Sequence, residues 1–284
     1  MEGSFKIERG KVSMKGYSTI KIERARGGVA TVTFNRPQRG NALNGEMLHE
    51  IENVFTEISQ DNGIRVVIIT GAGPCFCTGA DIGWFRDLTE RRARGEYGEE
   101  VSYSHRCSTL VGLAVRNTPQ PTIASINGLA IGGGATLALA CDIRIAAEEA
   151  NISFPFASTV GISPELGSTY TLPRLVGIDK ACELIFTGKS VTGKEAREIG
   201  LVSTVVPLAD LSKVTSELAD KIAGVAPTTV QLAKKALYHG LNSDIHSQLL
   251  WEEEGLRLGY ESEEHKEAIT AFFEKRKPVF KNRK

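Results

Sequence analysis

The most constraining feature of this 284-residue chain is a pair of short apolar runs, each followed at once by a glycine-rich turn. The first run, residues 65–70, is continuous and rich in β-branched residues, as in a strand that is buried on both faces. The second, residues 122–126, leads through a triple glycine at 132–134 into a helical pattern at 135–140. Strands buried on both faces need covering helices, so the chain is predicted to be an α/β protein.

The order of the patterns predicts how the chain is organised. Strand and helix patterns alternate as far as residue 206, whereas helical patterns dominate afterwards, and Pro227 suits the first turn of one of these helices. We therefore expect a polar N-terminal extension at 1–17, an α/β core at 18–206 and a C-terminal helical subdomain at 207–284.

Composition excludes several classes of function. Lys and Arg total 34, as do Asp and Glu, so no overall field attracts a nucleic acid or an anionic membrane. The longest apolar region contains charged residues and is not a membrane span. An odd number of cysteines and no secretory signal indicate a reducing compartment, and we expect a cytoplasmic protein. Cys75 and Cys77 form a C-x-C pair with no second pair at zinc spacing, so no metal is expected.

Both glycine-rich turns suggest chemistry carried out by the backbone. The first spans residues 71–79, and the second opens a helix, where unpaired N–H groups and the positive end of the helix dipole are exposed. Two backbone N–H groups that converge on one oxygen form an oxyanion hole, which would stabilise the enolate of a thioester. Three glycines before a helix also fit tight packing against a sheet. The triple-glycine turn matches neither a P-loop nor a dinucleotide-binding fingerprint.

Taken together, several segments resemble the enoyl-CoA hydratase/isomerase (crotonase) family. They are 35–43 (NRPQRGNAL), 75–82 (CFCTGADI), 126–134 (INGLAIGGG), 140–144 (ACDIR), 172–177 (LPRLVG) and 271–277 (AFFEKRK). The resemblance implies a spiral of strand–strand–helix (ββα) units with a C-terminal helical trimerisation subdomain. It also implies an acyl-CoA substrate, a homotrimer or a dimer of trimers, and no cofactor apart from the CoA of the substrate.

The resemblance also implies positions for the site. The oxyanion donors would be the backbone N–H groups of Ala80 and Gly133. Substrate contacts would come from Arg36, Arg39, Thr78, Ala80, Asp81, Ile82, Trp84, Gly132, Gly133, Phe272 and Lys275. Among these, Arg36 or Arg39 would meet CoA phosphates, and Phe272 and Lys275 would meet the nucleotide across a subunit interface. Asp81 also suits bracing of the first loop, Trp84 suits core packing, and Lys275 suits a solvated helix face.

The acidic residues decide which reaction of the family is expected. A hydratase of the family carries two glutamates, but this chain has Thr136 at the first position and Ala157 or Phe156 at the second. A carboxylate occurs instead at Glu165, beside a proline and at the predicted start of a helix. This position resembles the catalytic glutamate of Δ3,Δ2-enoyl-CoA isomerases, in which one carboxylate moves a proton from the α-carbon to the γ-carbon. A simple helix-terminal charge is the competing interpretation.

Other hypotheses stay open. Within the family, these are an enoyl-CoA hydratase, a CoA-thioester hydrolase and a dienoyl-CoA isomerase, although the last normally carries a second acid near Ala157. Outside catalysis, a CoA-binding relative without activity remains the alternative.

Overall fold

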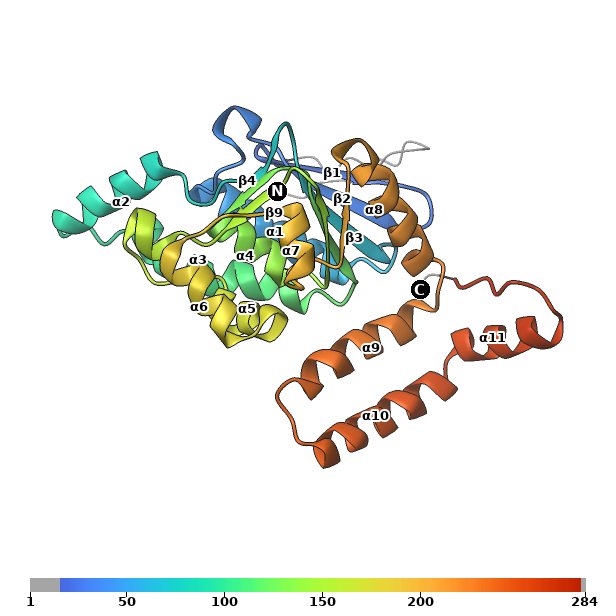
Figure 1. The fold of residues 1–284 in the computed structure, drawn as a ribbon. Coiled ribbons are helices and arrows are strands. Elements are labelled where there is room, and N and C mark those ends of the chain that lie inside the picture. Colours follow the sequence, from blue (N-terminus) through green and yellow to red (C-terminus); the bar gives the residue numbers. More distant parts are fainter. Residues whose placement is uncertain (1–15, 282–284) are drawn as a thin grey trace.

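A six-stranded sheet forms the centre of the molecule in the computed structural model, which describes residues 16–281 (Figure 1). The expected N-terminal extension therefore lies, apart from Gly16 and Tyr17, outside the described residues. The strand order in the six-stranded sheet is β1-β2-β3-β5-β7-β10. Only β1 and β2 pair antiparallel, and the other neighbours are parallel. The strands are β1 (Ile20–Arg24), β2 (Val29–Phe34), β3 (Val66–Gly71), β5 (Thr122–Ile126), β7 (Ile143–Ala147) and β10 (Thr204–Val206).

A second sheet of four short strands lies beside the first, in the order β4-β6-β8-β9. Its strands are β4 (Cys75–Cys77), β6 (Leu129–Ile131), β8 (Asn151–Ser153) and β9 (Val191–Thr192). The pairs β3–β4, β5–β6 and β7–β8 each place one strand in the large sheet and the next strand in the small one. Helices follow each pair, so the expected spiral of ββα units is confirmed.

Helices cover the sheets, as the apolar strands require. All five residues of β5 are buried, and α1 (Gly45–Gln60) buries one apolar face after Asn44 caps its start by accepting a hydrogen bond from Met47 N–H. Every residue of α4 (Gly133–Ala140) is buried. A Cβ at Gly134 would lie 2.1 Å from the carbonyl oxygen of Cys77. Glycine at this position therefore lets α4 pack directly against the small sheet.

Six further helices and two short helical turns complete the described part of the chain as far as Ala223. They are α2 (Ile82–Ala93), α3 (Glu99–Asn117), α5 (Ser168–Val176), α6 (Ile178–Thr187), α7 (Gly193–Glu198) and α8 (Leu208–Ala223), with the short turns η1 (Pro37–Arg39) and η2 (Phe156–Val160). Thr192 and Glu195 form a capping box at the start of α7.

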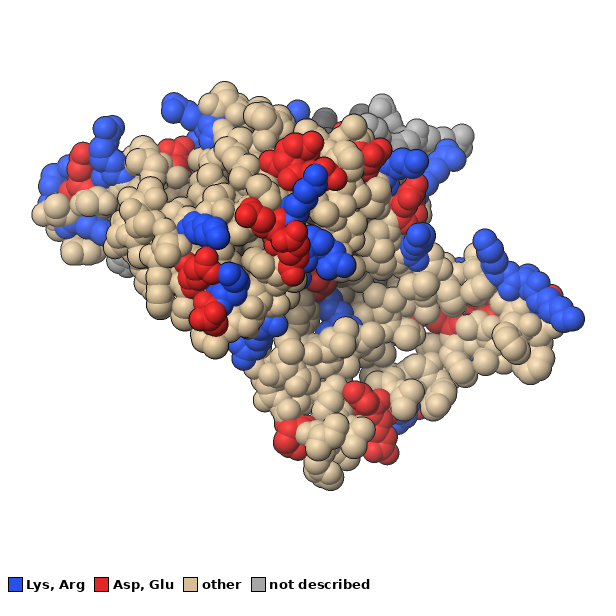
Figure 2. Space-filling model, viewed as in Figure 1, with Lys and Arg blue, Asp and Glu red and all other residues tan. Residues whose placement is uncertain are grey.

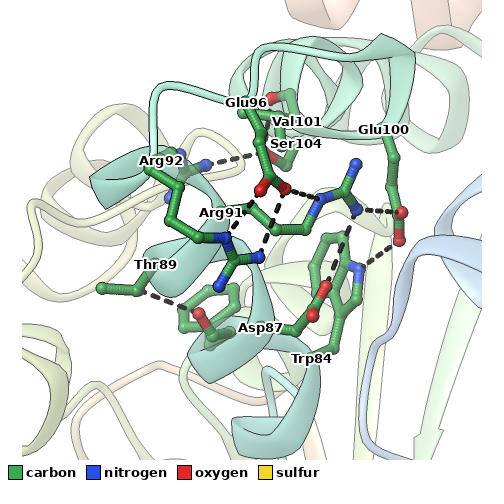
Figure 3. Close-up of polar contacts among 11 residues, drawn as sticks. Trp84, Asp87, Thr89, Arg91, Arg92, Glu96, Glu100, Val101 and Ser104 are labelled. Carbon is green, nitrogen blue, oxygen red and sulfur yellow. Dashed lines mark hydrogen bonds and ion pairs between the residues drawn. The ribbon is translucent and has the colours of Figure 1, made fainter.

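Helix α2 projects from the body of the molecule and is held mainly by polar contacts. Leu88 is its one buried residue. Figure 3 shows Arg91 between the carboxylates of Asp87 and Glu100, at 3.6 Å and 2.6 Å, while Trp84 Nε1 donates to Glu100 at 2.9 Å. These contacts join α2 to the first turn of α3.

The helical segment expected from residue 207 divides into two parts. Helix α8 buries Leu211, Thr215, Ala219 and Ala223 and packs against the large sheet. The last three helices form an arm that extends from the core (Figure 1), namely α9 (Pro227–Gly240), α10 (Ile245–Tyr260) and α11 (Glu263–Phe273).

A buried polar cluster attaches the arm to the core. Lys234 of α9 is 8% exposed and lies 2.8 Å from Asp142, which also accepts hydrogen bonds from Tyr238 Oη at 2.6 Å and Thr122 N at 2.7 Å. Lys234 Nζ also donates to the carbonyl oxygen of Gln120 at 3.0 Å. Removing one charge of such a pair leaves the other charge buried, so the arm depends on this cluster.

Charges of both signs are interspersed over the face shown in Figure 2. Within residues 16–281, no helix is long and apolar enough to cross a membrane. Over the same range, no group of three or more His, Cys, Asp or Glu side chains is placed to hold a metal ion.

Candidate active site

The two glycine-rich turns meet because β4 and β6 are parallel neighbours in the small sheet. Gly79 follows β4 with φ of +84°, and a Cβ there would lie 2.7 Å from the carbonyl oxygen of Ile131 and 3.5 Å from the nitrogen of Gly133. This position requires glycine both for its backbone angle and for the close approach of the second turn.

Hydrogen bonds made by Gly79 and Asp81, on either side of Ala80, direct the N–H of Ala80 away from Leu43. Leu43 donates its N–H to Gly79 O at 2.7 Å and accepts at its own carbonyl from Asp81 N at 2.8 Å. Successive backbone groups in an extended segment point to opposite sides. The N–H of Ala80 therefore points away from Leu43, and no acceptor for it is recorded among residues 16–281.

The N–H of Gly133 is made available by the start of α4. Gly132 has φ of +52° and ψ of −119°, a conformation restricted to glycine, and its N–H donates to Ser153 O at 2.9 Å. Gly133 is the first residue of the helix, where an N–H has no acceptor within the helix. Within residues 16–281, neither the N–H of Ala80 nor that of Gly133 has an acceptor, and both residues line the same site.

Glu165 lies beside the second of these amides. Its Oε1 would be 3.2 Å from a Cβ built on Gly133, with Leu43 Cδ1 and Leu166 Cδ1 also close. No hydrogen-bond donor to its carboxylate is recorded in the described part of the chain. Burial raises the pKa of Glu165 above the usual glutamate value. The group is therefore a carboxylate with increased basicity and no competing partner.

The expected helix position of Glu165 is corrected by the structure. Helix α5 begins at Ser168, because Leu166 and Gly167 have φ of +55° and +86° and interrupt a helix. Glu165 thus lies in a turn that precedes the helix, and it makes no cap for it. The raised pKa agrees with this position, since burial is its cause.

A cavity of about 400 Å³ encloses these groups. The predicted residues that line it are Arg39, Thr78, Ala80, Asp81, Ile82, Gly132, Gly133 and Glu165. Phe85, which follows the first glycine-rich turn, lines the cavity as well, but sequence reasoning did not assign the rest of the apolar wall, formed by Ala42, Pro155, Val160 and Ile162. Residues 155–162 connect strand β8 to the turn that carries Glu165. This position in the sequence could have predicted that they line the cavity.

Arg36 and Asp81 interact with each other at the edge of the cavity. Their side chains approach to 2.9 Å, and Arg36 also donates to the carbonyl of Ala42. Asp81 accepts from Gly83 N at 3.0 Å and so caps α2. Partial burial would raise the pKa of Asp81, but the hydrogen bond from Arg36 and those from the helix N–H groups hold it below its usual value. Asp81 therefore braces the loop as an anion.

Three predicted contact residues lie away from the cavity in this chain. Trp84 packs close to Gly45 and donates to Glu100. Phe272 is 77% exposed, and Lys275 follows it just after the end of α11. None of the three lines the cavity.

The positions of the hydratase glutamates are also visible. Thr136 is fully buried, does not line the cavity, and donates its hydroxyl to Gly132 O at 3.2 Å. Phe156 lines the cavity, and Ala157 is exposed. Among the cavity-lining residues, the carboxylates are Asp81 and Glu165, and Asp81 is already paired. The site thus combines two backbone donors with one unpaired base, as needed to remove a proton beside a carbonyl.

Comparison with known proteins agrees with this geometry. The family model for enoyl-CoA hydratase/isomerase matches residues 24–283. A short-chain-enoyl-CoA hydratase of Clostridium acetobutylicum is 41% identical over 90% of this chain and 96% of its own length. An enoyl-CoA isomerase/hydratase of Mycosarcoma maydis is 36% identical over 89% of this chain and 92% of its own. The crystal structure of an enoyl-CoA hydratase from Bacillus anthracis is 38% identical, with a TM-score of 0.84 over 94% of this chain and 100% of that one.

The fold and the site thus define a crotonase-type enzyme. The chain belongs to the enoyl-CoA hydratase/isomerase family.

Proposed function

We propose that this enzyme is a Δ3,Δ2-enoyl-CoA isomerase that uses Glu165 as its one acid–base group. The carrying observation is that Glu165 is the unpaired carboxylate in the cavity and lies against Gly133, whereas both positions of the hydratase glutamates lack an acid. A single base is enough to move a proton between two carbons of one substrate, but hydration also requires a group that activates water.

The proposed reaction begins when the Glu165 carboxylate removes a proton from C2 of a 3-enoyl-CoA. The electrons of the C–H bond form the C2–C1 double bond of a dienolate, and the thioester oxygen takes the negative charge. The N–H groups of Ala80 and Gly133 stabilise that oxygen. Protonated Glu165 then returns the proton to C4, the C2–C3 double bond forms, and the carboxylate is regenerated. No water, metal or cofactor is consumed.

The surroundings of Glu165 support this role. Burial raises its pKa towards the working pH, where a general base is most effective. Its position beside Gly133 allows base and oxyanion donor to act on one substrate. Arg39 lines the cavity and is exposed, and it is the proposed contact for a CoA phosphate, since the guanidinium of Arg36 is engaged by Asp81.

The test is conversion of trans-3-hexenoyl-CoA, followed with an added 2-enoyl-CoA hydratase and 3-hydroxyacyl-CoA dehydrogenase. We expect turnover by the wild type and a loss of about 10²-fold or more in Glu165→Gln. Glu198→Gln, on the exposed side of α7, is the matched control. A folded protein that binds acyl-CoA but leaves this substrate unchanged would refute the isomerase, and release of free CoA would then indicate a thioester hydrolase.

The hydratase is the second candidate, because several relatives carry that name. If the protein is a hydratase, it should hydrate crotonyl-CoA rapidly without any added coupling enzyme. With Thr136 buried and Phe156 in the wall, we expect that rate to lie well below the isomerase rate. A hydration rate equal to the isomerisation rate would contradict the proposal.

We further propose that the C-terminal arm is the trimerisation subdomain, in a homotrimer or a dimer of trimers. Helix α10 has no buried residue, and large apolar side chains that are more than half exposed lie along the arm, namely Leu237, Leu249, Leu250, Leu256, Phe272 and Phe273. Apolar surface of this extent indicates an interface. In the assembly, Phe272 and Lys275 would contact the nucleotide of a neighbouring subunit's substrate. The expected compartment is the cytoplasm.

A further inference from the structure

The turn that carries Glu165 is in an unusual backbone conformation. Leu166 is a non-glycine residue with φ of +55°, and Gly167 follows at +86°. Non-glycine residues rarely adopt this region, and they keep it where the surroundings hold them there. Within residues 16–281 the Glu165 carboxylate accepts no hydrogen bond, so its direction depends on the backbone of this turn and on the side chains packed around it, such as that of Leu166.

Helix α3 supplies the contacts that hold the turn. The N–H of Leu166 donates to the hydroxyl oxygen of Ser108 at 2.9 Å. One helical turn later, a Cβ on Gly112 would lie 3.1 Å from the carbonyl oxygen of Leu166, so glycine permits the close approach. Ser108 and Gly112 occupy positions i and i+4 and therefore share one face of α3. The turn therefore packs against this face of α3.

The other side of the turn is fixed as well. The carbonyl oxygen of Glu165 accepts from both the N–H and the hydroxyl of Ser168, each at 3.0 Å. The side chain of Leu166 is buried beside Gly133. Ser168 fixes the turn to α5, but Ser108 is the recorded hydrogen-bond link between the turn and another helix.

We infer that Ser108 is a positioning residue that holds Leu166 in its left-handed conformation and thereby directs Glu165 towards Gly133. The inference rests on the proposed function in assigning the chemistry to Glu165. Ser108 does not line the cavity and acts through the turn. Without its oxygen, Leu166 can relax to an ordinary backbone conformation, and the carboxylate moves away from the substrate.

The test compares Ser108→Ala, which removes the acceptor, with Ser108→Thr, which keeps a hydroxyl at the same place. Thr109→Ala is the matched control, because Thr109 is exposed on the same helix. We expect kcat for 3-enoyl-CoA isomerisation to fall about 10- to 100-fold in Ser108→Ala with KM changed less than about twofold, since an error of about 1 Å in a reacting group costs up to about 10²-fold. Ser108→Thr is expected to recover most of kcat.

A second variant perturbs the packing of the turn against α3 without removing the hydrogen bond. Gly112→Ala places a methyl group against the carbonyl of Leu166 and is expected to lower kcat in the same way. A third measurement needs no activity: amide hydrogen exchange at Leu166 should become faster in Ser108→Ala and stay unchanged in Thr109→Ala.

Unchanged exchange at Leu166 in Ser108→Ala would overturn the inference, whatever reaction the enzyme performs. So would a wild-type kcat in Ser108→Ala while Glu165→Gln is inactive. Full activity of Glu165→Gln would instead refute the proposed function, and faster exchange at Leu166 would still establish that Ser108 holds the turn.

Discussion

Gly133→Ala tests whether the space between the amide and the carboxylate is the reaction site. A Cβ at this position would lie 3.1 Å from Leu43 Cδ1 and 3.2 Å from Glu165 Oε1. Atoms in contact prefer about 3.5–4.0 Å, so one or both side chains must move by about 0.4 Å. The methyl group would also cover part of the volume in which the thioester oxygen and the α-carbon have to sit.

The fold should tolerate this change. The φ of Gly133 is outside the left-handed region, and the contacts of the added methyl are with side chains. Overpacking costs about 1–3 kcal/mol, whereas alanine is favoured over glycine in a helix by up to about 1 kcal/mol. The free energy of unfolding should therefore fall by about 3 kcal/mol at most.

Activity, in contrast, should fall strongly. The substitution keeps the amide of Gly133 but crowds the oxygen that the amide would bind, and displacement of a reacting group by about 1 Å costs up to about 10²-fold. We expect kcat to drop by about 10- to 10²-fold in the coupled 3-hexenoyl-CoA assay, with stability checked by thermal unfolding. Gly224→Ala is the control, because Gly224 is exposed at the end of α8 with an ordinary φ of −79° and does not line the cavity. A kcat within about threefold of the wild type in Gly133→Ala would refute the proposed site.

Two further predictions concern stability. Because burial raises the pKa of Glu165, the ionised carboxylate destabilises the folded state above that pKa, and the effect disappears as the pH falls below the ordinary glutamate value. Glu165→Gln should therefore unfold at a higher temperature than the wild type near pH 8 and at nearly the same temperature near pH 4; an equal difference at both pH values would contradict this. Lys234→Met leaves Asp142 without its cation and should lower the free energy of unfolding by about 3 kcal/mol in a denaturant titration, whereas Lys235→Met on the exposed side of α9 should change little. A loss below about 1 kcal/mol would show that the cluster does not secure the arm.

The fold was largely predictable because its signals are local. The strand at 122–126 was predicted with the bounds that it has, since a short apolar run between turn residues has few alternatives. The helix after the triple glycine was predicted two residues short, because a sequence pattern does not show that Gly133 already has helical angles. The resemblance gave the ββα spiral that local patterns alone leave open.

The residues of the candidate site could be proposed from the sequence, but their geometry could not. The family resemblance pointed to Ala80, Gly133 and Glu165, and the structure places all three on the lining of one cavity. The sequence did not show that Leu166 adopts a positive φ, because leucine gives no such signal. The helix after Glu165 was therefore expected to begin too early. Nor did the sequence show that Arg36 is paired with Asp81, since the two residues are 45 positions apart and meet only in the fold.

The pairing of β4 with β6 has a consequence for how enzymes of this architecture change their chemistry. Neighbouring strands lie about 4.8 Å apart, and the two strands that lead to Ala80 and Gly133 are such neighbours. Two amides at about that separation can each lie about 2.9 Å from one shared oxygen, which is the normal length of an N–H···O hydrogen bond. In the proposed site, the spacing of the strands would thus set the recognition of the thioester oxygen, and no side chain would be required. Substitutions at positions such as Thr136 and Glu165 can exchange one acid–base reaction for another while this spacing stays the same.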